Sequence, residues 1–497
     1  MRYKSTRNNE KFMNSSFAIL HGLANDGGLY VPESLPKLDL SYEFLKDMSY
    51  QEIAFYVLKN FFTNLKEEDL KASINSAYSS ETFSDKEIAP LVNINSEVSF
   101  TELFHGRTHA FKDLALSLFP YLIVSAKKSE NEKNEILILT ATSGDTGKAA
   151  LEGFKDIEGI KIIVFYPKNG VSPMQEDQMR KQLGNNVDII SIDGNFDDAQ
   201  GAVKRIFSSD HFKKILNENN TIFSSANSIN IGRLFPQVVY YITTYINLCK
   251  KNIIKPNEKF NVVVPTGNFG NILAAYIAKK MGIPINMLIS ASNENNVLSD
   301  FFKTGTYSKN RSFFSTVSPS MDVLLPSNFE RYLYYITGEN SNRINELMND
   351  LETKDSLSIS EKEFLNIQKE FFGDYASNEE TINSIKELYK TNNYLMDPHT
   401  AVGYNVWKKY INKTNDSTHT VIMSTAHPYK FPTAINSALE ISTAENPYDL
   451  LDAFVDSTKI TLPKQLVELK NLPIRFSTNI DKNDIEAYVE GKIKNKK

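Results

Sequence analysis

The sequence predicts an α/β protein with mainly parallel β-sheet covered by helices on both faces. From about residue 91 onward, apolar and β-branched runs alternate with helical segments. Such alternation is typical of parallel strands joined by crossover helices. The chain has 497 residues, more than one hydrophobic core usually organises, so we expect two or three domains.

The individual elements follow from local periodicity. Residues up to about 90 are expected to be mostly helical, because Leu45, Ile53, Val57 and Phe61 recur at helical spacing. Further along, apolar runs predict strands at 135–139, 160–166, 187–192, 261–264 and 419–424, and helices at 114–124, 173–183, 197–207, 238–248 and 272–278. A polar stretch rich in Glu, Lys and Asn, from about 342 to 394, predicts a helical insertion with solvated charges.

Composition excludes several classes of protein. A net charge of -5 argues against nucleic-acid binding, which favours a basic surface. No window approaches the ~20 apolar residues of a membrane span, and the polar N-terminus lacks a secretory signal, so we expect a cytoplasmic location. The single Cys249 cannot form an internal disulfide, and no Cys/His grouping has zinc-site spacing, so no metal is expected.

The segment Glu102–Asp113 is the first candidate site. It reads Glu-Leu-Phe-His-Gly-Arg-Thr-His-Ala-Phe-Lys-Asp and places Lys112 just before an apolar helical run. A lysine amine can form a Schiff base with an aldehyde cofactor, which carboxylates and imidazoles cannot do. Taken alone, Lys112 is better explained as a surface lysine at a helix start. Two further loops change that interpretation.

A glycine-containing loop connects a predicted strand to a predicted helix. The run from Asn261 stops at Pro265, passes through Thr-Gly-Asn-Phe-Gly-Asn, and continues as a helix. Backbone N–H groups and the helix dipole then converge on one point, which favours an anion. Gly267 and Gly270 leave room for a phosphate to approach the backbone. An ordinary turn between strand and helix is the alternative.

A second loop of this kind follows the run that begins at Glu135. It reads Thr142-Ser143-Gly144-Asp145-Thr146-Gly147-Lys148 and is dense in hydroxyls and backbone donors, which suits a substrate carboxylate. The alternative is a helix N-cap, where Thr and Ser are common.

These motifs together resemble the threonine synthases, pyridoxal-phosphate enzymes of fold-type II. Other matching segments along the chain are Gly22–Pro32, Asn227–Arg233, Ser318–Arg331, Asp397–Tyr404 and Ser424–Pro428. The resemblance implies two parallel-sheet lobes, as in the tryptophan synthase β-subunit. It also implies an N-terminal segment at 1–90 and a catalytic region at 91–497. Within that region we expect a smaller lobe at about 130–240 and a larger lobe formed by 91–129 with 241–497.

The resemblance implies pyridoxal 5'-phosphate as the cofactor. Lys112 would anchor it and carry protons, the loop 267–271 would hold its phosphate, and Thr425 would face its pyridine nitrogen. The expected cofactor-binding residues are therefore Lys112, Gly267, Asn268, Phe269, Gly270, Asn271 and Thr425. The expected substrate-binding residues are Thr142, Ser143, Gly144, Asp145, Thr146, Lys148, Ser228, Asn230 and Arg233.

Threonine synthases convert O-phospho-L-homoserine and water into L-threonine and phosphate, and the resemblance implies that activity here. The substrate phosphate needs cationic help, for which Lys148 and Arg233 are the candidates. Three alternatives remain: another fold-type II lyase such as a threonine or serine dehydratase, a non-catalytic relative that binds a phosphorylated metabolite, and an interaction protein. The oligomeric state, monomer or homodimer, stays open.

Three residues depart from the patterns of related enzymes. Arg107 and His109 stand where many relatives have proline and leucine, and we expect them to be loop residues without a chemical role. Asp145 stands where other fold-type II enzymes often have asparagine near the ring oxygen of the cofactor. An anion would be repelled there, so Asp145 is expected to turn away and cap the helix at Thr146.

Overall fold

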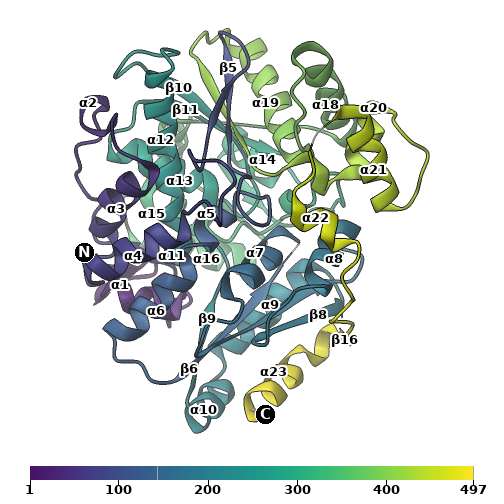
Figure 1. The fold of residues 1–497 in the computed structure, drawn as a ribbon. Helices are drawn as coiled ribbons and strands as arrows, with labels where there is room; N and C mark the ends of the chain where they lie inside the picture. The colour runs from purple at the N-terminus through teal and green to yellow at the C-terminus, as the bar shows by residue number, and fades with distance from the viewer. Residues whose placement is uncertain (143, 460, 496–497) are drawn as a thin grey trace.

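Two largely parallel β-sheets organise the chain, one in each of two lobes (Figure 1). The computed structural model describes residues 1–142, 144–459 and 461–495. Both sheets carry helices on both faces, which confirms the predicted α/β class. None of the helices in these described ranges is long and apolar enough to cross a membrane.

The smaller lobe is built on a five-stranded sheet with the order β16-β8-β7-β6-β9, all parallel. Its strands are β6 (Glu135–Ala141), β7 (Ile160–Pro167), β8 (Val187–Asp193), β9 (Thr221–Ser225) and β16 (Asn479–Asp481). Its helices are α7 (Asp145–Phe154), α8 (Pro173–Arg180), α9 (Phe196–Ser208), α10 (Asp210–Glu218) and α23 (Ile485–Lys494), with the short η3 (Lys482–Asp484). Ile136 and Ile138 pack on one face, and Leu137 packs with α9 and α10 on the other.

The larger lobe contains a six-stranded sheet with the order β14-β11-β10-β15-β5-β4, in which only the edge strand β4 runs antiparallel to its neighbour. Its strands are β4 (Leu91–Asn93), β5 (Val98–Glu102), β10 (Phe260–Pro265), β11 (Ile285–Ser292), β14 (Phe371–Tyr375) and β15 (Thr420–Ser424). The surrounding helices are α5 (Asp113–Leu116), α6 (Phe119–Ser129), α11 (Ile231–Leu234), α12 (Pro236–Lys250), α13 (Gly270–Met281), α14 (Val297–Thr304), α15 (Phe329–Ile336), α19 (Pro398–Thr414), α20 (Pro432–Leu439), α21 (Pro447–Thr458) and α22 (Lys464–Leu469), with η1 (Pro319–Met321) and η2 (Pro428–Lys430).

The predicted strands and helices of both lobes agree with the observed ones to within a few residues. The exception is the single helix predicted over 114–124, which is divided into α5 and α6. The second helix starts afresh at Phe119 with Pro120 in its first turn. Proline is tolerated in a first turn because its missing N–H has no intrahelical partner there.

The N-terminal segment is less helical than predicted. Helices α1 (Ser15–His21), α2 (Tyr42–Leu45), α3 (Tyr50–Phe61) and α4 (Glu67–Ala77) are present, but so is an antiparallel sheet of β1 (Tyr3–Ser5), β2 (Asn8–Met13) and β3 (Tyr30–Pro32). Its central strand β1 pairs with both others, and it is fully buried. Strands β1 and β3 have three residues each, too few for period-two alternation to reveal them.

The stretch 342–394 is only partly helical, which corrects the predicted helical insertion. Helices α16 (Ser341–Thr353), α17 (Glu361–Ile367) and α18 (Asn378–Asn392) are present. However, β13 (Ser356–Ser358) pairs with β12 (Thr306–Ser308), and β14 forms one edge of the six-stranded sheet. The polar flanks conceal the apolar Phe371 and Phe372 that let β14 pack on this sheet.

The end of the chain returns to the smaller lobe. Strand β16 pairs in parallel with β8, and α23 packs against α10 (Figure 1). Residues 479–494 therefore lie with the smaller sheet, whereas the expected boundaries place them in the larger lobe. The side-chain hydrogen bonds from Arg205 to Glu486 and from His211 to Glu490 span 281 and 279 residues, so no local pattern predicts this packing.

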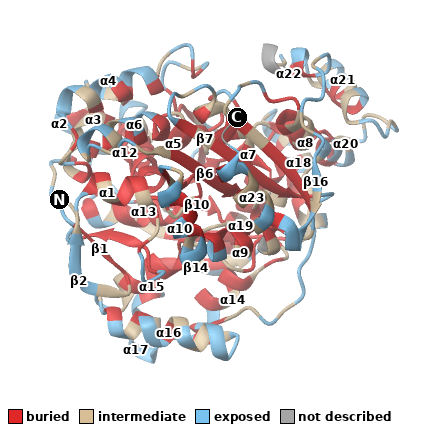
Figure 2. Ribbon diagram, turned by 90° about the horizontal axis from the view of Figure 1, so that it is seen from below, coloured by how far each residue is buried: buried red, intermediate tan, exposed pale blue. Residues whose placement is uncertain are grey.

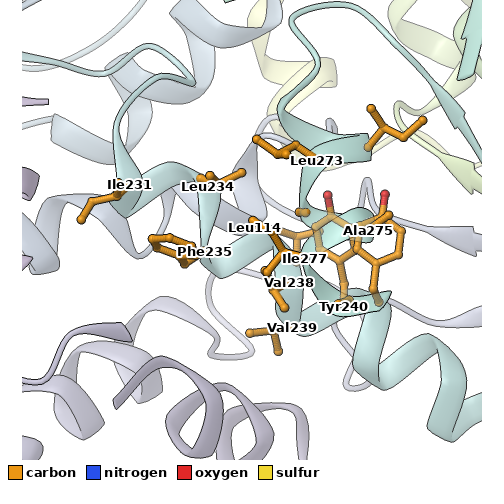
Figure 3. Close-up of a cluster of buried hydrophobic side chains, with 14 of the residues drawn as sticks. Leu114, Ile231, Leu234, Phe235, Val238, Val239, Tyr240, Leu273, Ala275 and Ile277 are labelled. Carbon is orange, nitrogen blue, oxygen red and sulfur yellow. The ribbon is translucent and has the colours of Figure 1, made fainter. Parts of the chain in front are cut away.

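The central strands and the helices between the lobes are buried (Figure 2). Figure 3 shows one apolar cluster at this point, in which Leu114 of α5 meets Leu234 of α11 and Val238 of α12, with Leu273 of α13 beside them. Each such side chain contributes about 1.5–3 kcal/mol when fully buried. The cluster fixes the helix that follows the lysine loop against the helix that follows the glycine loop.

We expect Arg331→Met to lower the free energy of unfolding by about 2–4 kcal/mol, because buried carbonyls would lose charge-assisted partners. Arg331 is fully buried and donates to the carbonyls of Tyr30, at 2.9 Å, and Ile229. It thus ties β3 to the loop before α11. Denaturant titration measures the change. The half-buried Arg343→Met is the control, and an equal effect of both variants would contradict this role.

Candidate active site

A cavity lies where loops from both sheets meet. It is lined by Asp145 after β6, Gly267 after β10, and Thr425 after β15, together with Lys112 from the loop that follows β5. These loops leave the carboxyl ends of parallel strands, where α/β proteins bind their ligands. The structure therefore brings the lysine, glycine and hydroxyl-rich motifs of the sequence to one place.

Hydrogen bonds fix the loop that carries Lys112. The buried Asp113 carboxylate accepts from the backbone N–H of Thr108 at 2.9 Å and from its hydroxyl at 2.6 Å. The backbone N–H of Phe111 donates to the carbonyl of Thr425 at 2.8 Å. Lys112 is thereby held at the start of α5, with its side chain only 11% exposed.

The amine of Lys112 is chemically competent near neutral pH. Burial lowers its pKa to about 8; Asp145 opposes the shift, while Lys430 and Arg233 add to it. The amine lies 3.9 Å from the Asp145 carboxylate. An amine with such a pKa is partly unprotonated near neutral pH, so it can act as a nucleophile or a base.

Asp145 does not cap α7, which corrects the expectation that it turns away. The N-cap position belongs to Gly144, and no side chain of a described residue caps this helix. The Asp145 carboxylate instead accepts from Gln175 Nε2 at 2.9 Å, from Ser320 Oγ at 3.1 Å, and from the Lys430 ammonium. Burial alone would raise the pKa of Asp145, but Lys430 and Lys112 outweigh it and hold this pKa well below its usual range. The buried ammonium of Lys430 thus compensates the buried negative charge of Asp145, a pairing that the sequence did not predict.

The glycine loop forms a cradle whose geometry suits an anion. A Cβ at Gly267 would lie 2.7 Å from the carbonyl oxygen of Ser320, so no side chain fits there. Phe269 adopts a left-handed conformation with φ of 64°, and α13 begins at the next residue. The first N–H groups of a helix have no intrahelical partners, and the helix dipole adds positive potential.

Two asparagines of this loop also face the cavity. The Asn268 side-chain oxygen accepts from Ser327 Oγ at 3.1 Å. The Asn271 side-chain oxygen accepts from the hydroxyls of Tyr240 and Tyr241, while its buried Nδ2 has no hydrogen-bond partner among the described residues. An unpaired buried donor costs about 1–3 kcal/mol, so the site favours a ligand with an acceptor at this point.

Thr425 lies directly beside the lysine loop. It follows β15, lines the cavity, and donates its N–H to Thr400 Oγ1 at 3.2 Å. Its neighbour Ala426 forms an antiparallel bridge with Ala110. The backbone therefore fixes the threonine hydroxyl relative to the lysine.

The hydroxyl-rich loop contributes fewer free donors than its composition suggests. The hydroxyl of Thr142 accepts from the N–H groups of Gly144 and Gly147 at 3.0 and 2.8 Å, so it shapes the loop itself. Thr142 and Thr146 line the cavity, whereas Gly144 does not. Ser143, also expected to bind substrate, lies outside the described residues.

Of the two cations expected to bind the substrate phosphate, only Arg233 reaches the cavity. It is 2% exposed and donates to the carbonyl of Ala226 at 2.6 Å, and no residue in the described part of the chain accepts from its buried Nε. Burial lowers its pKa to about 10, so it stays charged near neutral pH. Lys148 does not line the cavity, because it pairs with Glu152 at 3.4 Å and with Gln182.

Of Ser228 and Asn230, both expected to bind substrate, only Ser228 lines the cavity. Ser228 lines the cavity, and its hydroxyl accepts from Asn328 Nδ2 at 3.0 Å. Asn230 caps α11 at Gly232 and donates to the carbonyl of Ile19 at 2.8 Å, away from the cavity lining. Its role is to position α11, and with it Arg233.

Arg107 and His109 lie outside the cavity lining, as loop residues without a chemical role would. Arg107 is exposed, whereas His109 is buried. Burial lowers the pKa of His109 to about 3, so its ring is neutral near neutral pH.

Several functional residues were missed by sequence reasoning, among them Lys430, Gln175 and Ser320, which hold Asp145. His399 also lines the cavity: its Nε2 accepts from the Ser320 N–H at 3.1 Å, and its Nδ1 lies 2.7 Å from Asp397. Ser320 and His399 had a signal, since they lie in the Ser318–Arg331 and Asp397–Tyr404 segments of the resemblance, whereas Gln175 and Lys430 lie in none of the matching segments.

The residues present fit pyridoxal 5'-phosphate. The loop Gly267–Asn271 admits no side chain at Gly267 and suits an anionic group, and Asn271 offers a donor that no described residue satisfies. Lys112 supplies an amine of lowered pKa in the same cavity. These features suit a molecule that carries both a phosphate and an aldehyde.

Comparison with known proteins agrees with this assignment. A family model described as "Pyridoxal-phosphate dependent enzyme" matches residues 93–425. Two further models, "Threonine synthase N terminus" and "Threonine synthase, C-terminal", match residues 2–78 and 400–490. The matches together cover both lobes and the N-terminal segment.

Individual relatives span most of the chain. The threonine synthase of Schizosaccharomyces pombe is 38% identical over 88% of this chain and 89% of its own length. The human protein "Threonine synthase-like 1" is 38% identical over 96% of this chain and 66% of its own length. The crystal structure of pyridoxal-phosphate-bound threonine synthase from Brucella melitensis superposes with a TM-score of 0.85 at 36% identity, covering 99% of both chains.

The likeness to that structure confirms the expected fold-type II architecture with two parallel-sheet lobes. From the extent of these matches, the chain belongs to the threonine synthase family of pyridoxal-phosphate-dependent enzymes.

Proposed function

We propose that this protein is a threonine synthase, which converts O-phospho-L-homoserine and water into L-threonine and phosphate. The observation that carries the proposal is the meeting of three groups in one cavity: the Lys112 amine, the glycine cradle, and the buried guanidinium of Arg233. The names of relatives that align over nearly the whole chain support it.

The cradle residues Gly267–Asn271 would hold the cofactor phosphate, Lys112 its aldehyde carbon, and Thr425 its ring nitrogen. When bound, pyridoxal phosphate supplies an electron-withdrawing ring that stabilises negative charge at the α-carbon of an attached amino acid. A hydroxyl beside the ring nitrogen, in place of a carboxylate, moderates that withdrawal.

Lys112 moves the protons. Its amine, with a pKa of about 8, can take the proton from the substrate α-carbon and hold it at Nζ. The same nitrogen can then return protons to the carbon chain after phosphate has left. Because the lysine loop is fixed by Asp113 and Thr425, this nitrogen stays positioned through successive transfers.

Arg233 would bind the substrate phosphate. Its Nε, which no described residue satisfies, offers a donor in the cavity, and its fixed positive charge would stabilise the charge that develops on a departing phosphate. The substrate carboxylate would bind at the start of α7, near Thr142 and Thr146, where backbone donors and the helix dipole favour an anion.

The second candidate function is that of a family member that does not form threonine, such as a non-catalytic relative that binds a phosphorylated metabolite. It is favoured by the match to human "Threonine synthase-like 1" at the same identity as the S. pombe enzyme. Another fold-type II lyase acting on an amino acid without phosphate is the related possibility. Release of inorganic phosphate from O-phospho-L-homoserine, with L-threonine formed in equal amount, separates the proposed activity from both.

Lys112→Ala should abolish the visible absorption band of the bound cofactor and reduce phosphate release by about 10³-fold or more, because both the anchor and the base are removed. The exposed Lys128→Ala is the control and should keep both. Full activity in Lys112→Ala would contradict the proposed role of Lys112.

Gly267→Ala should weaken cofactor binding roughly 10- to 100-fold, since overpacking against the carbonyl of Ser320 costs about 1–3 kcal/mol. Titration of cofactor-free protein with pyridoxal phosphate, followed by the visible band, measures the affinity. A Cβ added at Gly491 has no neighbouring heavy atom within 4 Å, so Gly491→Ala serves as the control. Unchanged affinity in Gly267→Ala would remove the cradle from the cofactor site.

Arg233→Gln should lower kcat/KM for O-phospho-L-homoserine by roughly 100-fold or more, because a buried charge pair with the phosphate is lost. Binding of L-threonine, which has no phosphate, should change far less when followed by the visible band. Arg205→Gln, at an exposed arginine, is the control. Equal losses for both ligands would show that Arg233 acts on the structure and not on the phosphate.

A further inference from the structure

One carboxylate in the cavity is shared by two lysines. Asp145 lies 3.9 Å from the Lys112 amine through one oxygen and binds the Lys430 ammonium through the other. Lys430 is fully buried, and Asp145 is 3% exposed. Gln175 and Ser320 complete the hydrogen bonds of the carboxylate, so its position is fixed from three elements.

Lys430 belongs to neither the lysine loop nor the cofactor cradle. It ends the short helix η2, and its ammonium binds a carboxylate that is 285 residues away in sequence. It does not line the cavity, whereas Asp145 and Lys112 do. In this pair, the Asp145 carboxylate therefore lines the cavity, and the Lys430 ammonium lies on the side of the carboxylate away from the cavity.

Other charged groups face the same cluster. Arg233 and Asp113 act on Lys112 in addition to the pair, and His399 faces Asp145. His109 and His427 face Lys430, but burial lowers the pKa of each ring well below neutral. Asp113 is engaged by Thr108. Asp145 and Lys430 are thus the two opposed charges that directly adjoin each other beside the Lys112 amine.

We propose that Asp145 and Lys430 form a fixed pair of opposite charges that sets whether the nitrogen of Lys112 is protonated. Asp145 favours the proton on that nitrogen, and Lys430 limits this effect while keeping Asp145 ionised and in place. Both are positioning residues. The inference deepens the proposed function, on which it rests for the cofactor-bound state.

The two charges should act in opposite directions. An opposite charge within about 4–6 Å changes a pKa by roughly 1–3 pH units. Removal of the anion in Asp145→Asn should therefore lower the pKa of the Lys112 amine by about 1–3 pH units. Removal of the cation in Lys430→Met leaves the anion uncompensated and should raise the same pKa by about 1 pH unit or more.

The amine is titrated by competitive acetylation of the cofactor-free protein across pH, with labelling of Lys112 quantified by mass spectrometry. In the cofactor-loaded protein, the pH titration of the visible band reports the same nitrogen. Lys181→Met is the matched control: Lys181 is also buried, with 7% exposure, and is paired with Asp177 at 2.9 Å, but it lies outside the cavity lining. It should leave both titrations unchanged.

A purely structural role would not produce shifts of opposite sign. If Lys430→Met alone fails to fold, the double variant Asp145→Asn/Lys430→Met replaces it, because it removes both charges of the pair. The pKa of the Lys112 amine in the double variant should exceed that in Asp145→Asn. Shifts in the same direction, or no shift, would overturn the inference. If no visible band forms in the unaltered protein, the proposed function fails instead, and acetylation still decides the role of the pair.

Discussion

The site depends on one buried carboxylate that is stabilised by two ammonium groups. Asp145, without compensation, would cost several kcal/mol to remove from water. Lys430 compensates it from η2, and Lys112 approaches from the loop after β5. Because these groups come from both lobes, this pairing forms only when the lobes pack together. Assembly of the site therefore requires that the two lobes pack together.

The topology explains why so many functional groups converge. Loops after β6, β10 and β15 leave the same ends of their strands, and the Phe111–Thr425 hydrogen bond joins the lysine loop to one of them. The apolar cluster around Leu114 then holds the helices behind these loops. With Lys112 and Arg233 on its wall and Lys430 behind Asp145, the region carries more positive than negative charge, which suits an anionic cofactor and substrate.

Local sequence patterns predicted the strand–loop–helix units and the motifs that line the cavity. They could not predict pairings between distant segments. Lys430 is separated from Asp145 by 285 residues, and without it the orientation predicted for Asp145 was wrong. The same limit applies to Lys148, whose partner Gln182 lies in a separate element, and to β14 and β16, whose neighbours in the sheets are remote. Strands of three residues in the N-terminal segment carry too little periodicity to be recognised.

The central claim is that Lys112, and not the nearby Lys430, anchors the cofactor. Borohydride reduction of the cofactor-loaded protein, followed by proteolysis and mass spectrometry, would locate the attachment directly. The account predicts the added pyridoxyl mass on the peptide that contains Lys112 and none on the peptide that contains Lys430. Attachment at Lys430, or an unmodified Lys112 in protein that has bound the cofactor, would contradict it.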